Sequence, residues 1–245
     1  MENRWSEADA AEFVRRYAGQ GVAEDLALRV YSSRLLGADP RLVQHGGGNT
    51  SLKTTARDVL GAEVPVLCVK GSGWDLGDIE PAGLPAVRLE PLLALRRLET
   101  LSDEAMVDAQ RGALMSSAAP NPSVETLLHA WVAPRYVDHT HANAVLALSD
   151  QPDGEAICRD LYGPRMALVP YRMPGFQLAK LAAEVFEAHP RAEGMILLKH
   201  GVFTWGETAR EAYERMIAVV TAAEQRLSAA RPPQVRAPAA PSRTA

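Results

Sequence analysis

The chain has 245 residues and a formal net charge of −4, with 47% hydrophobic and 23% charged residues. This composition is ordinary for a globular protein, and the length suffices to bury the core of one large domain. The chain has no long basic run and no apolar stretch near the roughly 18–20 residues of a spanning helix, so neither nucleic acid nor a membrane is an expected partner. An acidic, polar N-terminus and two cysteines outside any metal or redox motif predict a cytoplasmic location.

The first half of the chain begins with two predicted helices. Ser6 opens an S-x-x-D helix start, and a second helix covers about residues 22–36. Strand-like segments follow at 41–45, 50–54 and 64–70, with glycine-rich turns at 46–49 and 71–73 between and after them. Helical patterns return at about 91–99 and 103–114.

The second half mixes strands and helices. The segment NPSVETLLHAWV at 121–132 predicts a helix with Asn121 as N-cap and Pro122 at its first position. Strands are expected at 135–141, 167–171, 194–200 and 201–205, and helices at 142–148, 175–189 and about 207–228. These elements lack a regular βαβ rhythm, so they predict one three-layer α/β domain over residues 1–228 with a largely antiparallel or mixed sheet. The Pro/Ala-rich residues 229–245 are predicted to form a disordered tail.

Four side chains are candidates for a metal centre. His139 and His141 stand one residue apart on a predicted strand, so their imidazoles project to one face, although such a pair is more often structural. His200 ends an apolar strand, and Glu125 lies near a predicted helix start, where the helix dipole alone would favour a carboxylate. Three imidazoles with a carboxylate or water form a normal catalytic set for a divalent metal. His129, one turn after Glu125, is either a partner of this site or a packing residue.

Three turns rich in small residues are candidates for an anion site. They are HGGGNTSLK at 45–53, VKGSGWD at 69–75 and NPSVE at 121–125. Backbone amides in such turns, and hydroxyls at helix starts, converge readily on phosphate. A tight polar β-turn explains the first segment equally well, and none matches a Walker A or dinucleotide fingerprint.

Five motifs in chain order carry a resemblance to a known family: HGGGNTS, KGSGWDL, NPSVETLLH, VDHTHA and LLKHGVFTWG. Together they resemble the class II aldolase/adducin family over residues 3–228, and most closely the aldolase portion of bifunctional rhamnulose-1-phosphate aldolase/alcohol dehydrogenases. The resemblance implies an α/β/α fold with a central, mostly antiparallel sheet, usually assembled as a tetramer. It also implies a zinc-dependent lyase acting on a phosphorylated sugar.

The resemblance assigns roles to particular residues. It implies that His139, His141 and His200 hold Zn²⁺ or another divalent metal, and that Glu125 is the acid/base residue. The metal would stabilise the enediolate left when the C3–C4 bond of a ketose 1-phosphate breaks, so no lysine is assigned to catalysis. The phosphate-binding positions of the family fall on Gly48, Asn49, Ser72, Gly73 and Ser123.

Some features depart from the family pattern. Val124 stands where simpler relatives often have a second serine. Some relatives use a tyrosine from a neighbouring subunit as an acid toward the aldehyde half of the substrate; Tyr162 and Tyr171 are candidates for this role, although neither lies in a matching motif. The bifunctional relatives continue into a dehydrogenase, so a separate dehydrogenase is a candidate partner. A sugar-phosphate epimerase or dehydratase would use the same residues, and a non-catalytic adducin-like module is the alternative from a different class.

Overall fold

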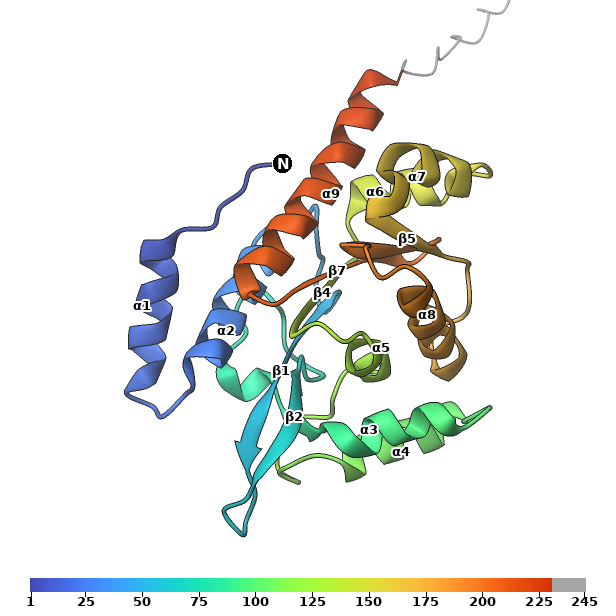
Figure 1. Ribbon diagram of the computed structural model, residues 1–245. Coiled ribbons are helices and arrows are strands. Elements are labelled where there is room, and N and C mark those ends of the chain that lie inside the picture. The colour runs from blue at the N-terminus through green and yellow to red at the C-terminus, as the bar shows by residue number, and fades with distance from the viewer. Residues whose placement is uncertain (231–245) are drawn as a thin grey trace, which may run out of the picture.

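A single mixed sheet of seven strands forms the centre of the molecule in the computed structural model, which describes residues 1–230 (Figure 1). The strand order is β3-β2-β1-β4-β7-β6-β5. Only β5 and β6 pair in parallel, and the other neighbours pair antiparallel. The strands are β1 (Asn49–Arg57), β2 (Glu63–Val69), β3 (Ala86–Arg88), β4 (Tyr136–Thr140), β5 (Met166–Val169), β6 (Gly194–Leu197) and β7 (Gly201–Gly206).

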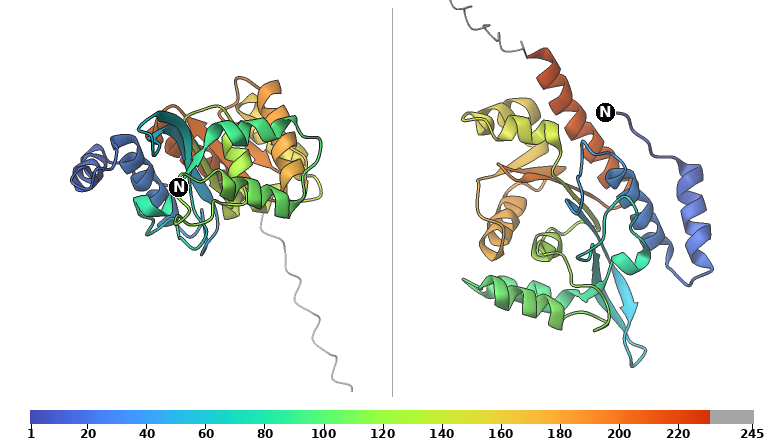
Figure 2. Two further views of the ribbon diagram at one scale, coloured as in Figure 1. Left: turned by 90° about the horizontal axis from the view of Figure 1, so that it is seen from below. Right: turned by 180° about the vertical axis from the view of Figure 1, so that it is seen from behind.

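Helices cover both faces of the sheet, and two hydrophobic clusters divide accordingly (Figures 1 and 2). One layer comprises α1 (Glu7–Ala18), α2 (Glu24–Gly37), α6 (Asn143–Ser149), α7 (Gly154–Tyr162) and α9 (Ala209–Ala229). The other comprises α3 (Leu89–Ala94), α4 (Asp103–Gly112), α5 (Thr126–Trp131) and α8 (Phe176–Ala188). Successive side chains of β4 point to opposite faces of the sheet, so Tyr136 packs into the first hydrophobic cluster and Val137 into the second. The predicted three-layer α/β/α class with a mostly antiparallel sheet is confirmed.

Local signals account for several boundaries. Ser6, Ser102 and Thr208 each accept a hydrogen bond from a backbone N–H three residues later, so they cap α1, α4 and α9. The short helices are η1 (Pro81–Gly83), η2 (Leu95–Arg97) and η3 (Gly163–Arg165).

Two local predictions are wrong. Residues 41–45 form turns and not a strand, because the carbonyl of Asp39 accepts hydrogen bonds from the N–H groups of Leu42 and Val43. Residues 121–125 lie before α5 and not within a helix, because the Ser123 N–H donates to Lys70 and the Asn121 carbonyl accepts from Ser72. Helix α7 was not predicted from the pattern at all.

A buried ion pair connects α2 to the central strand β4. Arg29 Nη2 lies 2.6 Å from Asp138 Oδ1, and both side chains are inaccessible to solvent. Arg29 also donates to Ser32 Oγ at 2.6 Å and to the Ser51 carbonyl at 3.3 Å. Asp138 and His139 are successive residues of β4, so they project to opposite faces of the sheet.

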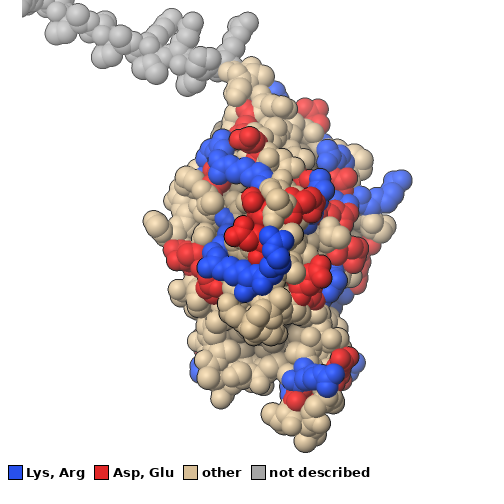
Figure 3. All heavy atoms as spheres, turned by 90° about the vertical axis from the view of Figure 1, so that its left-hand side faces the viewer, with Lys and Arg blue, Asp and Glu red and all other residues tan. Residues whose placement is uncertain are grey.

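Charge on the side of the molecule that α1 occupies is of both signs, with Lys/Arg and Asp/Glu groups interspersed (Figure 3). Arg210 of α9, for example, lies 2.8 Å from Glu7 of α1.

No helix within residues 1–230 combines the length and the apolar character needed to cross a bilayer. The boundary predicted at residue 228 is not tested by this structure, and residues 231–245 of the predicted tail lie outside the described part.

Candidate active site with a metal centre

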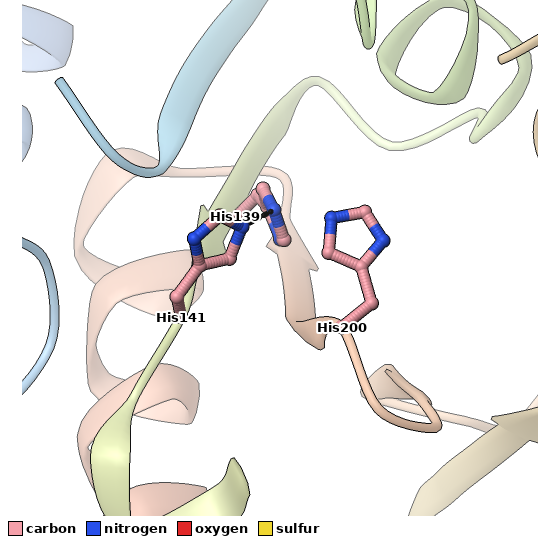
Figure 4. A group of neighbouring side chains, drawn as sticks. All are labelled: His139, His141 and His200. Carbon is pink, nitrogen blue, oxygen red and sulfur yellow. Dashed lines mark hydrogen bonds between the residues drawn. The ribbon is translucent and has the colours of Figure 1, made fainter. Parts of the chain in front are cut away.

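Three imidazoles meet beside the end of β4. His139 is in β4, His141 follows two residues later, just past the strand, and His200 lies in the tight turn between β6 and β7. Because β7 pairs directly with β4, the turn before β7 lies beside the end of β4. One ligand-type nitrogen from each of the three lies within 4.8 Å of the others, and the rings cluster in edge-on or tilted arrangements (Figure 4).

The protonation state of His139 suits a metal ligand. Its Nδ1 lies 3.1 Å from the carbonyl oxygen of Val202, so Nδ1 carries the donated proton and Nε2 is left with a lone pair. Burial lowers the pKa of His139 to about 3, and burial also lowers the pKa of His141. The ring of Phe203 stacks on His139 at a centroid distance of 4.1 Å and fixes its plane.

The Glu125 carboxylate faces the imidazoles from the residue before α5. Oε2 accepts a hydrogen bond from Asn49 Nδ2 at 2.6 Å and lies 3.3 Å from His139 Nε2. The other carboxylate oxygen of Glu125, Oε1, is buried and lies 3.0 Å from His200 Nε2. Among the described residues, no donor is aligned to form a hydrogen bond with it. Burial raises the pKa of Glu125, but the positive charge that His139 and His200 carry when protonated, together with the hydrogen bond from Asn49, outweighs it and holds that pKa below its usual range.

This arrangement fits a divalent cation. The carboxylate oxygen of Glu125 faces the lone pair of His139 Nε2, and that nitrogen is also 3.0 Å from His141 Nε2. Lone pairs at such distances repel one another unless a proton or a cation lies between them. Three neutral imidazoles and one carboxylate are a donor set that Zn²⁺ and similar ions prefer.

A pocket of about 470 Å³ opens beside this cluster. Three chain segments build this pocket. β1 starts at the end of the sheet where β2 finishes, so the segment before β1 lies beside the segment after β2. Residues 121–123 join them, because Pro122 pairs with Gly71, just after β2. Glu125 and His141 lie in its wall together with every predicted phosphate-binding position, which are Gly48, Asn49, Ser72, Gly73 and Ser123. The structure thus brings the predicted phosphate residues and the predicted catalytic residues to one place.

Gly48 is required by the shape of this wall. Its φ is +63°, and a Cβ there would lie 2.7 Å from the carbonyl oxygen of His139 and 2.6 Å from Val43 Cγ1. Any larger residue would push the glycine loop away from β4. The loop is further held by Asp75, which accepts a hydrogen bond from the Gly46 N–H at 2.5 Å.

Asn49 and Lys70 make contacts in this wall that the sequence did not predict. The Asn49 amide does not stand free for phosphate, since Nδ2 donates to Glu125 and, at 3.1 Å, to Ser123 Oγ. Lys70 also lines the pocket, and within residues 1–230 its ammonium makes one long hydrogen bond, of 3.3 Å, to the Gly46 carbonyl. Burial lowers the pKa of Lys70, with Asp75 and Glu125 acting against it. The sequence feature that points to a role for Lys70 is its position between an apolar strand and the GSG turn at 71–73.

The two tyrosines named as candidate acids differ in exposure. The Tyr162 hydroxyl is in the core and donates to the Val219 carbonyl at 3.2 Å, so it does not face the pocket. Tyr171 is 52% exposed and follows β5.

Comparison with known proteins identifies the family. Residues 28–227 match the model described as the class II aldolase and adducin N-terminal domain. The chain is a member of the class II aldolase/adducin family. A domain described as the N-terminal class II aldolase domain of a conserved protein from Thermoplasma acidophilum is similar in structure, with a TM-score of 0.82 and 39% identity over 93% of this chain and 99% of that one.

Two further relatives place this class II aldolase/adducin domain in context. A curated Bacillus subtilis protein described as the uncharacterized oxidoreductase YuxG is 41% identical over 196 residues, which are 80% of this chain but only 28% of that protein. The L-fuculose-1-phosphate aldolase of Thermus thermophilus shares the fold, with a TM-score of 0.52 and 21% identity over 82% of this chain and 95% of that one.

Proposed function

We propose that the protein is a divalent-metal-dependent aldolase that cleaves a ketose 1-phosphate, with rhamnulose 1-phosphate, giving dihydroxyacetone phosphate and lactaldehyde, as the first substrate to test. The main observation in support is the position of Glu125, which lies 3.0 Å from His200 and faces three clustered imidazoles. Glu125 also lies in the wall of a pocket lined by three turns rich in small residues. Membership in the class II aldolase/adducin family supports the same chemistry.

His139, His141 and His200 would hold the metal, with zinc the first candidate. When bound, the metal supplies a Lewis acid that stabilises the negative charge of an enediolate. Glu125, a carboxylate at rest because its pKa is low, takes the proton from the former C3 carbon of the ketose in the condensation direction. In cleavage the C4 hydroxyl gives up its proton as the C3–C4 bond breaks, and Glu125, once protonated, delivers one proton to the same carbon, so protons balance over the reaction.

The pocket wall positions the phosphate. Gly48, Ser72, Gly73 and Ser123 offer backbone N–H groups or hydroxyls, and the Lys70 ammonium adds a positive charge in the same wall. Phosphate held at this end fixes the distance between the reacting carbon and Glu125, so binding energy is used for orientation. Asn49, the fifth predicted phosphate-binding position, also donates a hydrogen bond to Glu125.

The remaining predictions form part of the same proposal. We expect a homotetramer in the cytoplasm, with a role in rhamnose catabolism and a dehydrogenase as a separate partner. The oxidoreductase description of the Bacillus subtilis relative supports a link to dehydrogenase chemistry.

A retro-aldol assay over a panel of ketose 1-phosphates tests the proposal. Zinc-loaded protein should release dihydroxyacetone phosphate from at least one of them, most rapidly from rhamnulose 1-phosphate. An isomeric or dehydrated product without cleavage would instead identify an epimerase or a dehydratase. A full panel without turnover, from protein that holds no metal, would indicate an adducin-like binding module.

A further inference from the structure

A fourth imidazole, that of His129, is buried behind the acid/base residue. It is in α5, its side chain is inaccessible to solvent, and it is outside the group of three metal-ligand candidates. Its Nε2 lies 2.5 Å from Asn49 Oδ1, and its Nδ1 lies 2.8 Å from Ser51 Oγ. Asn49 in turn donates to Glu125 at 2.6 Å, so a continuous chain of contacts runs from Ser51 to the carboxylate.

The contacts of this chain fix one tautomer. Asn49 Oδ1 only accepts hydrogen bonds, so the Nε2 of His129 must carry a proton. Neutral His129 then has an unprotonated Nδ1, which accepts the hydroxyl proton of Ser51. With the opposite tautomer, Nε2 would need a donor, the Asn49 amide would turn over, and its oxygen would face the Glu125 carboxylate.

The surrounding elements hold His129 against rotation. Asn49, Ser51 and Lys53 alternate along β1 and therefore project to the same face, toward α5. The Lys53 ammonium donates to the backbone carbonyl of His129 at 2.7 Å, and the ring of Phe203 lies 5.4 Å from the imidazole. The imidazole is thus fixed at its backbone, at both nitrogens and at one edge.

We propose that His129 is a positioning residue that keeps the Asn49 amide turned so that it donates to Glu125. The catalytic consequence rests on the proposed aldolase function. Fixed in this way, Glu125 presents its second oxygen toward the imidazole cluster and does not rotate away between turnovers. The order of the groups is His129, Asn49, Glu125, and only the last touches the substrate.

Nitrogen-15 NMR of the zinc-loaded full chain tests the orientation without reference to activity. Histidine-labelled protein should show His129 as a neutral imidazole protonated at Nε2, with its signals assigned by their loss in His129→Gln. An imidazole protonated at Nδ1, or an imidazolium at neutral pH, would overturn the proposal.

Two amide variants test the consequence for catalysis. In His129→Gln the amide nitrogen reaches the place of Nε2 and still donates to Asn49, whereas in His129→Asn it reaches only the place of Nδ1, near Ser51. We expect kcat to fall about 10–100-fold in His129→Asn, with KM and metal content within about threefold, and to recover to within about threefold of wild type in His129→Gln. Equal kcat values for the two variants, at matched melting temperature, would show that His129 is only a packing residue. If the wild-type protein shows no turnover, the aldolase function is refuted, and with it the proposed effect of His129 on kcat. The NMR result still decides, independently, whether His129 fixes the orientation of the Asn49 amide.

Discussion

Replacing Glu125 with glutamine removes the proposed acid/base group while leaving its size unchanged. The amide oxygen of the new side chain still accepts from Asn49 Nδ2, which lies 2.6 Å from the carboxylate in the wild type. His139, His141 and His200 remain, so metal content should be retained. The variant therefore isolates proton transfer from metal binding and from folding.

The size of the effect follows from the surroundings of Glu125. General acid–base catalysis contributes about 10²–10⁴ in rate, or about 3–5 kcal/mol of barrier. The other carboxylate lining the pocket, Asp75, is 46% exposed and is engaged by the Gly46 N–H, so it does not replace Glu125. We therefore expect a loss of kcat in the upper part of that range, about 10³–10⁴-fold.

The assay couples release of dihydroxyacetone phosphate to oxidation of NADH, and metal content is measured on the same samples. The matched control is Glu155→Gln, an exposed residue of α7 that pairs with Arg159 at 2.6 Å, which should leave both quantities unchanged. Turnover of Glu125→Gln within about threefold of wild type, with metal bound, would refute the assignment, because it lies far below the range for a lost acid or base.

Three further predictions concern metal, folding and pH. Chelator treatment should abolish activity until zinc is restored, and His141→Ala should lose most of its metal whereas the exposed His189→Ala keeps about one ion per chain. Asp138→Ala leaves the Arg29 charge buried without its partner, so denaturant unfolding should show a loss of about 3–5 kcal/mol. Burial lowers the pKa of Lys53 to about 7, below that of an unfolded lysine, so the unfolded state binds more protons between pH 7 and about 10. Stability relative to Lys53→Met should therefore rise by about 2 kcal/mol from pH 7 to pH 9, and an unchanged difference would refute the burial of this charge.

Local patterns were sufficient where an element is stabilised mainly by its own residues. The cap at Ser6 predicted α1 correctly, and the strand expected at 135–141 matches β4. Local patterns were insufficient where pairing with a distant segment determines the secondary structure. Residues 121–123 carry a good helix start but pair instead with the segment after β2, and a single sequence does not reveal that pairing.

The candidate site shows the same division. The spacing of His139 and His141 places two imidazoles on one side of the chain wherever the segment is extended, so the sequence predicts that pair directly. The position of Lys70 in the pocket and the engagement of Asn49 with Glu125 depend on which loops meet at one sheet edge. For the same reason His129 remained ambiguous until its two nitrogen contacts were known.

The buried pair of Arg29 and Asp138 has a consequence for how the chain folds before any ion binds. Asp138 precedes His139 in β4, so sliding that strand by one position against its neighbours would exchange the carboxylate and the imidazole between the two layers. Sliding in one direction would set an imidazole against Arg29 in a dry interior, and sliding in the other would put the Asp138 carboxylate in the place of His139. The high free energy of that misaligned state selects against it, so α2 enforces the correct alignment of the strand that carries His139 from the far side of the sheet.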